Sequence, residues 1–174
     1  THNVVHQFSL FDEVECDNYN NLNKTKLDKA TVIVLSPGPG SPKDYPSTSN
    51  IYKKFKSKKK IIGICLGFQQ ILFCEGAEIV EQKKIFHGFQ SKIEVINNKS
   101  IFKKGKKFKV GRYHSLKLKE PFKNKDFEIT MRCLESNVAM SIENKKDKIY
   151  GFQFHPESFL TNNGNLLIKK ILSA

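Results

Sequence analysis

A cysteine framed by two glycines is the residue of this chain best suited to covalent chemistry. In the stretch GICLG, Cys65 stands two places from Gly63 and two places from Gly67. This spacing is the thiol version of the G-x-S-x-G turn, in which a nucleophile sits on a sharp bend between a strand and a helix. Small neighbours let the bend close and a substrate approach, and a helix start favours thiolate over thiol. The pattern predicts a nucleophilic Cys65, with the Leu66 N–H directed at any oxyanion that forms.

Cys65 also has a plainer interpretation, as a small buried side chain in a strand-helix unit. The other three cysteines, Cys16, Cys74 and Cys133, lack glycine framing, and we interpret them in that way. No pair of cysteines has the C-x-x-C spacing, which argues against a zinc site and against a disulfide framework. We therefore expect no bound metal and reduced thiols in a cytoplasmic protein.

A nucleophilic thiol needs a base that is itself held in place. The chain has five histidines, and one of them lies in GFQFHPES, where His155 follows an apolar run and Glu157 comes two residues later. In extended chain, residues two apart lie on the same side, so the carboxylate can hold one nitrogen of the imidazole. The alternative is a strand that ends in a proline turn beside an exposed acid. With Cys65, the pattern predicts a Cys-His-Glu set.

The elements that must position these residues alternate between strand and helix in the first half of the chain. The predicted order is a strand at 31–35, a helix at 50–58, a strand at 61–64 and a helix from Leu66 to near Gly76. Both strands are apolar without alternation, as in a parallel sheet that is covered on both faces. The stretch SPGPGSP at 36–42 cannot continue a strand, so a tight loop follows the first one.

The second half changes to shorter, alternating segments separated by polar turns, which favours antiparallel pairing. The predicted strands are 92–96, 107–113, 127–132, 137–142 and 148–154, and a helix is predicted at 164–172. Val4, Phe8 and Phe11 recur at helical spacing and predict the end of an amphipathic helix. We interpret residues 1–174 as a single α/β domain with an antiparallel extension.

The charge of the chain raises the question of a nucleic-acid partner. The net charge is +13, but only Arg112 and Arg132 are arginine, and the lysines fall in short dispersed runs. Readout of bases and phosphates favours the planar arginine fork, so we interpret the lysines as solvated faces and expect no nucleic-acid partner. No apolar run approaches the ~20 residues of a membrane span, so we expect no membrane association.

Taken together, the motifs resemble a known family. LSPGPGSP (35–42), GICLGFQ (63–69) and GFQFHPES (151–158) are similar, in order and separation, to the class I, triad-type glutamine amidotransferases. GRYHSL (111–116) and FHGF (86–89) narrow the resemblance to the glutaminase subunits of anthranilate synthase and para-aminobenzoate (aminodeoxychorismate) synthase. The resemblance implies a flavodoxin-like, mostly parallel central sheet flanked by helices, with an antiparallel extension.

The resemblance also implies roles for individual residues. Cys65 would attack the side-chain amide of L-glutamine, His155 would move the protons and Glu157 would orient His155. Gly38 and Leu66 would donate to the oxyanion. Because Pro37 and Pro39 lack an N–H, the donors of the loop must be Gly38, Gly40 or Ser41. The implied substrate-binding residues are Gly38, Pro39, Gly40, Gln69, Ser115 and Leu116.

Some positions depart from the pattern of the family. Phe68 stands where the family usually has histidine, and we expect altered packing there. Phe89 stands where lysine is common, next to the partner-contacting pair His87-Gly88, which puts details of docking in doubt. His114 is expected to support the glutamine pocket. The family also begins with a strand and a loop, which we expect to precede Thr1.

The resemblance implies a separate, larger partner. That chorismate-using synthase subunit would bind Mg²⁺ and receive ammonia, and this chain would need no cofactor. Alternatives stay open: an amidotransferase of GMP or carbamoyl-phosphate synthesis, an inactive regulatory subunit, or a basic nucleic-acid binder. The sequence leaves the anthranilate and aminodeoxychorismate branches, or both, undecided.

Overall fold

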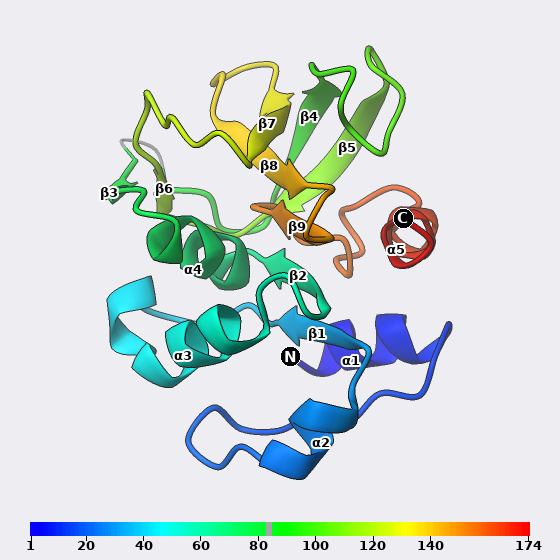
Figure 1. Ribbon diagram of the computed structural model, residues 1–174. Coiled ribbons are helices and arrows are strands. Elements are labelled where there is room, and N and C mark those ends of the chain that lie inside the picture. Colours follow the sequence, from blue (N-terminus) through cyan, green and yellow to red (C-terminus); the bar gives the residue numbers. More distant parts are fainter. Residues whose placement is uncertain (83–84) are drawn as a thin grey trace.

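The computed structural model describes residues 1–82 and 85–174, arranged around one mixed sheet with helices on both faces (Figure 1). The seven strands lie in the order β1-β2-β9-β8-β7-β4-β5. Their bounds are β1 Val32–Leu35, β2 Lys60–Ile64, β4 Phe89–Val95, β5 Lys107–Arg112, β7 Glu128–Cys133, β8 Ala139–Asn144 and β9 Ile149–Phe152. A separate antiparallel pair consists of β3 Ile79–Glu81 and β6 Leu116–Leu118.

Helices cover the sheet on its two sides. Their bounds are α1 His2–Ser9, α2 Lys24–Lys29, α3 Pro46–Phe55, α4 Leu66–Cys74 and α5 Gly164–Leu172. Successive residues of β2 point to opposite faces: Ile61 packs in the apolar cluster of α3 and α4, and Ile62 and Ile64 pack in that of α1 and α5. Both faces of the parallel strands are therefore covered, which explains why their sequences lack alternation.

Strands β1, β2 and β9 are parallel, and the remaining pairings of the large sheet, from β9 through β8, β7 and β4 to β5, are antiparallel. The predicted α/β fold with flanking helices and an antiparallel extension is confirmed, and the antiparallel part supplies more of the pairings. The carboxyl ends of β2 and β9 lie side by side, because Ile64 pairs with Phe152. This pairing brings the two segments that carry Cys65 and His155 to the same edge of the sheet.

Helices α1, α2 and α3 differ from the expectations, and strands β3 and β6 were not predicted. Helix α1 ends at Ser9, so Phe11 lies beyond it and is 37% exposed, whereas Val4 and Phe8 are buried as predicted. Helix α3 begins earlier than predicted, because Pro46 suits the first helical turn, and it ends at Phe55. Helix α2, which is capped by the Asn23 side chain, was not predicted.

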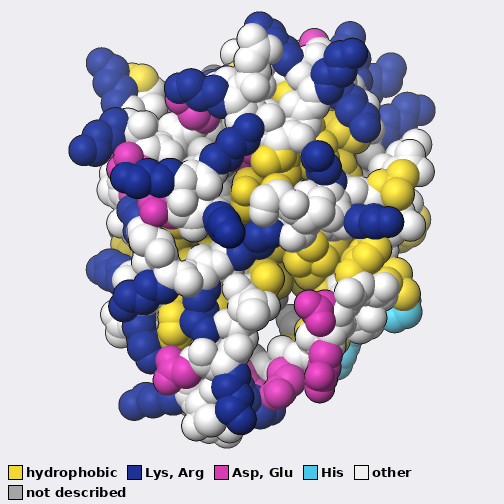
Figure 2. Space-filling model, turned by 45° about the vertical axis from the view of Figure 1, so that its right-hand side comes forward, with side chains coloured by type: hydrophobic (Ala, Val, Ile, Leu, Met, Phe, Trp, Pro, Cys, Tyr) yellow, Lys and Arg dark blue, Asp and Glu magenta, His cyan; other side chains and the backbone are white. Residues whose placement is uncertain are grey.

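The surface is basic and uneven. Lys and Arg side chains are spread over the face in Figure 2, with acidic side chains gathered near its lower edge. One depression of about 680 Å³ lies at the amino end of β2 and is lined by Lys29, Lys58, Lys59, Lys60, Lys146 and Lys148, among others. In the described part of the chain, no helix is both long and apolar enough to cross a bilayer.

Candidate active site

Cys65 occupies the bend between β2 and α4. It is the N-cap of α4, with φ 52° and ψ −101°, a backbone conformation that costs a non-glycine residue about 1–3 kcal/mol. Its N–H donates to the carbonyl of Phe152 over 2.8 Å, which ties the bend to the end of β9. The predicted strand-to-helix bend is confirmed. The side chain is buried, as the plainer interpretation also requires, so the strained backbone is the feature that distinguishes the two.

The two glycines are needed because the backbones approach closely. A Cβ on Gly67 would lie 2.1 Å from the carbonyl oxygen of Leu35, at the end of β1. A Cβ on Gly63 would lie 2.5 Å from the carbonyl oxygen of Gly67. Any side chain at either position would therefore push α4 away from the sheet and move Cys65.

His155 lies just beyond β9, beside the bend. Its backbone N–H donates to the carbonyl of Gly111 over 3.0 Å, and its carbonyl accepts from the Thr161 hydroxyl over 2.6 Å. The Tyr113 ring packs edge-on against the imidazole, with centroids 5.0 Å apart. The backbone of His155 is thus fixed by two hydrogen bonds, and its imidazole is packed against the Tyr113 ring.

Glu157 fixes the ring through its second nitrogen. The Nδ1 of His155 and the Oε1 of Glu157 are 2.7 Å apart, and both side chains are largely buried. Burial alone would lower the pKa of His155, but the neighbouring Cys65 and Glu157 side chains outweigh it and raise that pKa from 6.5 to about 9. The imidazolium form is therefore favoured at neutral pH.

Cys65 and His155 come together at the carboxyl ends of β2 and β9. The Nε2 of His155 is buried and has no hydrogen-bond partner among the described residues. The pairing of Ile64 with Phe152 and the bond from the Cys65 N–H to the Phe152 carbonyl bring Cys65 to the end of β9 that leads into His155, and Cys65 is among the groups that raise the pKa of the ring. With Nδ1 occupied by Glu157, Nε2 is the nitrogen that can exchange a proton with the sulfur. Hydrogen bonds between catalytic groups are often long before a substrate is bound.

The loop after β1 lies against the bend. A Cβ on Gly38 would lie 2.9 Å from the Cδ2 of Leu66, so only glycine fits there without displacing that side chain. The Ser41 N–H already donates to the Asp44 carboxylate over 2.7 Å. Of the three possible donors in this loop, Gly38 and Gly40 therefore remain.

Pro39 and Gly40 lie exposed at the tip of this loop. The Tyr45 hydroxyl donates to the Pro39 carbonyl over 2.9 Å, which braces the tip. Gly40 has φ +74°, a value that other residues rarely adopt. The tip thus has a defined shape before any substrate binds.

Gln69 and Leu116 meet one helical turn beyond Cys65, where the Gln69 N–H donates to the Cys65 carbonyl over 3.1 Å. Gln69 is buried, and its Nε2 lies 3.4 Å from the Leu116 carbonyl. Ser115 is exposed, and its carbonyl accepts from the Gln82 N–H over 2.9 Å. The structure therefore brings Gln69 and the 115–116 segment together, as the resemblance implies.

His114 supports this segment from beneath. Its Nε2 accepts from the Arg112 Nε over 3.0 Å, so its Nδ1 carries the proton and donates to the Leu116 carbonyl over 2.8 Å. Burial, and then the Arg112 charge, lower the pKa of His114 from 6.5 to about 4. His114 is thus a neutral support, consistent with its expected structural role.

The family departures have structural correlates. Phe68 is fully buried in the cluster of α3 and α4, where it packs against Gly151, while Cys65 belongs to the cluster on the opposite face. The effect of Phe68 is therefore one of packing. Phe89 is 49% exposed and packs edge-on against Phe86, with centroids 5.9 Å apart, beside the exposed His87.

Sequence reasoning missed two buried polar residues of the site. Gln153 is fully buried and its Nε2 lies 3.8 Å from the Cys65 sulfur. Arg112 is also fully buried, with its guanidinium 3.6 Å from the centre of the Phe86 ring. A glutamine two residues before a predicted base, and an arginine two residues before a predicted support, were the available signals.

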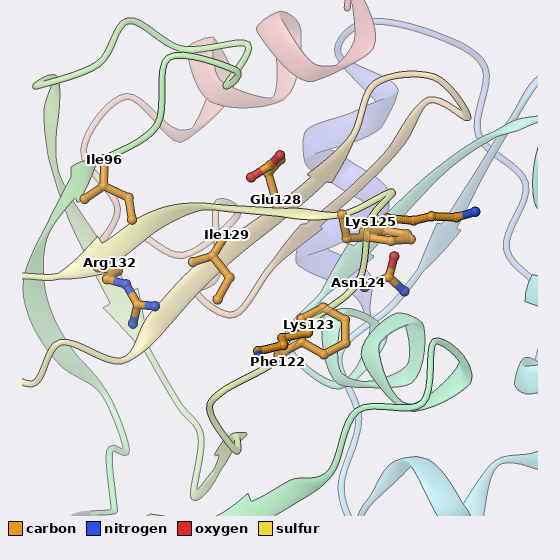
Figure 3. Close-up of a pocket in the computed structure, with 9 residues that line it drawn as sticks. Ile96, Phe122, Lys123, Asn124, Lys125, Glu128, Ile129 and Arg132 are labelled. Atoms are coloured by element: carbon orange, nitrogen blue, oxygen red, sulfur yellow. The ribbon is translucent and has the colours of Figure 1, made fainter.

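The cavity in Figure 3 is separate from this site. It has a volume of about 610 Å³ and lies beside β7, with Phe122, Glu128 and Arg132 among its lining residues (Figure 3). None of the predicted site residues lines it. Within residues 1–82 and 85–174, no cluster of three or more His, Cys, Asp or Glu side chains is arranged to hold a metal ion.

Comparisons with known proteins identify the family of the chain. Residues 1–174 match the family described as "Glutamine amidotransferase class-I". Anthranilate synthase component 2 of Lactococcus lactis is 34% identical over 179 residues, which cover 99% of this chain and 88% of that protein. The protein of the same name from Helicobacter pylori (strain 26695) is 34% identical over 94% of this chain and 89% of its own length.

A solved structure extends the likeness to the fold. A Thermoplasma acidophilum protein assigned to GMP synthase superposes with a TM-score of 0.84 at 22% identity, covering 99% of this chain and 86% of that one. At this identity the likeness concerns the fold alone. The match of the whole chain to the family, together with the close relatives, shows that the chain belongs to the class I glutamine amidotransferases.

Proposed function

We propose that this chain is a glutaminase subunit that hydrolyses L-glutamine to glutamate and ammonia through Cys65, His155 and Glu157. The observation that carries the proposal is the juxtaposition of a thiol on a strained bend with a carboxylate-held imidazole whose pKa is raised to about 9. A neighbouring imidazolium favours the thiolate form of a cysteine, and the thiolate is the nucleophile. An inactive regulatory subunit would have no need of this set.

In the first half of the reaction, Cys65 Sγ attacks the side-chain carbonyl carbon of glutamine. Because the raised pKa of His155 favours the imidazolium, the proton of Cys65 already lies on Nε2 when the sulfur attacks as the thiolate, and the ring then gives that proton to the departing nitrogen, which leaves as ammonia. A γ-glutamyl thioester remains on Cys65. Glu157 holds the ring by Nδ1 throughout, so Nε2 stays directed at the reacting atoms.

In the second half, water attacks the thioester. Nε2 of His155 accepts a proton from the water, the carbon–sulfur bond breaks, and the proton returns to the sulfur as glutamate departs. In both halves an oxyanion forms, and the N–H groups of Leu66 and of Gly38 or Gly40 would donate to it. Each such donor typically contributes ~3 to 4 kcal/mol in the transition state.

The amino-acid end of glutamine would be held by Gln69 and the backbone of 115–116, which lie together, with the Leu116 carbonyl braced by His114. The loop tip of Gly38, Pro39 and Gly40 would close the opposite side. This division leaves the side-chain amide of the substrate at the sulfur.

We further propose that a chorismate-using synthase subunit receives the ammonia and binds the Mg²⁺. The relatives named anthranilate synthase component 2 support this assignment. Aminodeoxychorismate synthesis, or service to both synthases, stays open. The free cysteines agree with a reducing, cytoplasmic location.

A second candidate is an amidotransferase subunit of GMP synthesis, favoured by the fold likeness to the Thermoplasma protein. Sequence identity supports the chorismate-using assignment instead, since the fold likeness is at only 22% identity.

The basic surface could aid docking with an acidic synthase, in which case complex formation would weaken as salt rises. Complex formation that is independent of salt would contradict that idea.

The test is an ammonia-release assay on the chain alone and with each synthase. Wild type with its cognate synthase should release ammonia from glutamine, and Cys65→Ser should not. Product identification from chorismate and glutamine then distinguishes anthranilate from aminodeoxychorismate. Equal ammonia release by wild type and Cys65→Ser would overturn the mechanism, and transfer only to a purine nucleotide would favour the second candidate.

A further inference from the structure

Gln153 is a buried amide that the mechanism above does not use. It lies one residue beyond β9 and is 0% exposed. Its backbone N–H donates to the Met140 carbonyl over 3.0 Å, so its main chain is held as an extension of the sheet. The chain bends at residues 153 and 154 before His155. The Gln153 side chain lies on the side of Cys65, since its Nε2 is 3.8 Å from the sulfur.

The Gln153 side chain bridges two residues of the site. Its Nε2 donates to the sulfur of Cys65 over 3.8 Å, and its Oε1 accepts from the Nε2 of Gln69 over 3.1 Å. The reversed amide would turn its oxygen to the sulfur and set two NH₂ groups against each other. Only one orientation therefore satisfies both neighbours.

Gln69 continues the connection toward the substrate side. Its Nε2 is shared between the Gln153 oxygen and, at 3.4 Å, the Leu116 carbonyl. With the nitrogen so held, the Gln69 carbonyl oxygen is the atom that can accept from the α-ammonium group of a bound glutamine. A continuous series of contacts thus joins the amino-acid end of the pocket to the nucleophile.

We propose that Gln153 is a positioning residue that couples recognition of glutamine by Gln69 to the orientation and ionisation of the Cys65 sulfur. The inference rests on the proposed function, because it assigns a purpose to the same site. A neutral N–H donor to sulfur favours the thiolate over the thiol, since only the thiolate is a strong acceptor. The charged groups that act on the same sulfur are His155 and, through it, Glu157, and both stay in place when Gln153 is changed.

The direct test is the pH dependence of Cys65 alkylation by iodoacetamide, followed by peptide mass spectrometry. Exposed Cys16 serves as an internal reference in every sample. Gln153→Leu should raise the pH midpoint of Cys65 alkylation by about one pH unit, the size expected for one hydrogen bond to a charged group. Gln153→Met provides the same readout if the leucine variant does not fold.

Gln70→Leu is the matched control. Gln70 is the next residue of α4 after Gln69, is equally buried, and bonds the Ser49 hydroxyl over 2.6 Å instead of the site. It should leave the midpoint unchanged. A Gln153 variant whose midpoint equals that of Gln70→Leu would overturn the inference. Wild-type Cys65 no more reactive than Cys16 would instead count against the proposed function itself.

A second measurement tests the coupling to Gln69. Steady-state glutaminase kinetics of Gln69→Leu, Gln153→Leu and the double variant form a cycle in the synthase complex. We expect each single change to raise KM, Gln153→Leu also to lower kcat, and the double variant to be less impaired than the product of the two. Losses that multiply would show that the residues act independently and would contradict the proposal.

Discussion

Two largely buried histidines of this site differ in the charges that surround them. His155 faces a carboxylate and a thiol, and its pKa is raised to about 9. His114 faces the guanidinium of Arg112, and its pKa is lowered to about 4. Both rings are largely removed from water, and burial alone lowers both pKa values. The sign of the neighbouring charge therefore decides which ring can carry a proton.

The comparison separates two kinds of support within one pocket. The ring beside Glu157 is suited to moving protons, because its charged form is stabilised and Nε2 is unoccupied among the described residues. The ring of His114 has both nitrogens engaged, one with Arg112 and one with the Leu116 carbonyl. It can hold the pocket, but it has no nitrogen left for chemistry.

The largest effect is expected when Cys65 or His155 is replaced. Cys65→Ser or His155→Asn should lower kcat for glutamine hydrolysis by at least about 10³-fold, as expected for residues that act as one catalytic unit. Circular dichroism should show that both variants fold. Ammonia release by folded His155→Asn near the wild-type rate would remove the ring from the mechanism.

Glu157→Gln would make the surroundings of His155 more like those of His114. Without the carboxylate the pKa of His155 should fall, and kcat should decrease by about 10² to 10⁴-fold, since the ring loses its orienting partner. The pH–rate profile measures both effects. The Glu157→Asp variant should recover part of the activity, and a profile unchanged in Glu157→Gln would contradict the role.

Changing His114 should affect binding more than chemistry. In His114→Asn the Leu116 carbonyl loses its Nδ1–H donor, so KM for glutamine should rise by about 10-fold, the value of one hydrogen bond, while kcat changes little. A fall in kcat at unchanged KM would assign His114 to the reaction itself.

The same two rings should give opposite slopes of stability against pH. The pKa of His114 is lowered in the fold, so its contribution is complete above pH 6.5 and is lost as pH falls toward 4, by about 3 kcal/mol in all. The pKa of His155 is raised, so its contribution is complete below pH 6.5 and is lost as pH rises through 9.

Urea unfolding from pH 4 to pH 9.5 measures both slopes. His114→Asn should reduce the pH dependence of the free energy of unfolding only on the acidic side, and His155→Asn only on the alkaline side. If the free energy of unfolding falls as steeply toward pH 4 in His114→Asn as in wild type, carboxylates and not His114 control the acid stability.

The smallest effect is expected far from the pocket. The lysine-lined depression lies at the amino end of β2, whereas Cys65 follows its carboxyl end. Replacing Lys146 and Lys148 by glutamine should leave glutaminase activity within about two-fold, since exposed charges at this distance are screened. A larger loss would mean that this basic surface takes part in catalysis or docking.

Much of this arrangement could be predicted, because local patterns control it. The apolar strand, the glycine frame and the helix at Cys65 are adjacent in the sequence, and the helix at 164–172 matches α5. The contact of His155 with Glu157 was predicted correctly, but the extended chain assumed for it is wrong: residues 156 and 157 form a turn in which the Ser158 N–H donates to the His155 carbonyl over 3.2 Å, and this turn brings the carboxylate to the ring.

The missed features depend on partners distant in the chain. The burial of Arg112 comes from the Phe86 ring and the Ser91 and Cys133 side chains, and charge alone predicts exposure for an arginine. Gln153 acquires its role only when β9 lies beside β2. The short strands β3 and β6 exist as one pair, so neither has a pattern of its own.

The central claim is that Cys65 becomes the acyl carrier. The most direct measurement is peptide mass spectrometry of the chain in complex with its synthase, quenched in acid during turnover of glutamine. The account predicts the mass of one γ-glutamyl group on the peptide that contains Cys65, and its absence in Cys65→Ser. Turnover with the adduct on Cys16, Cys74 or Cys133, or with none on any cysteine under conditions that preserve thioesters, would contradict it.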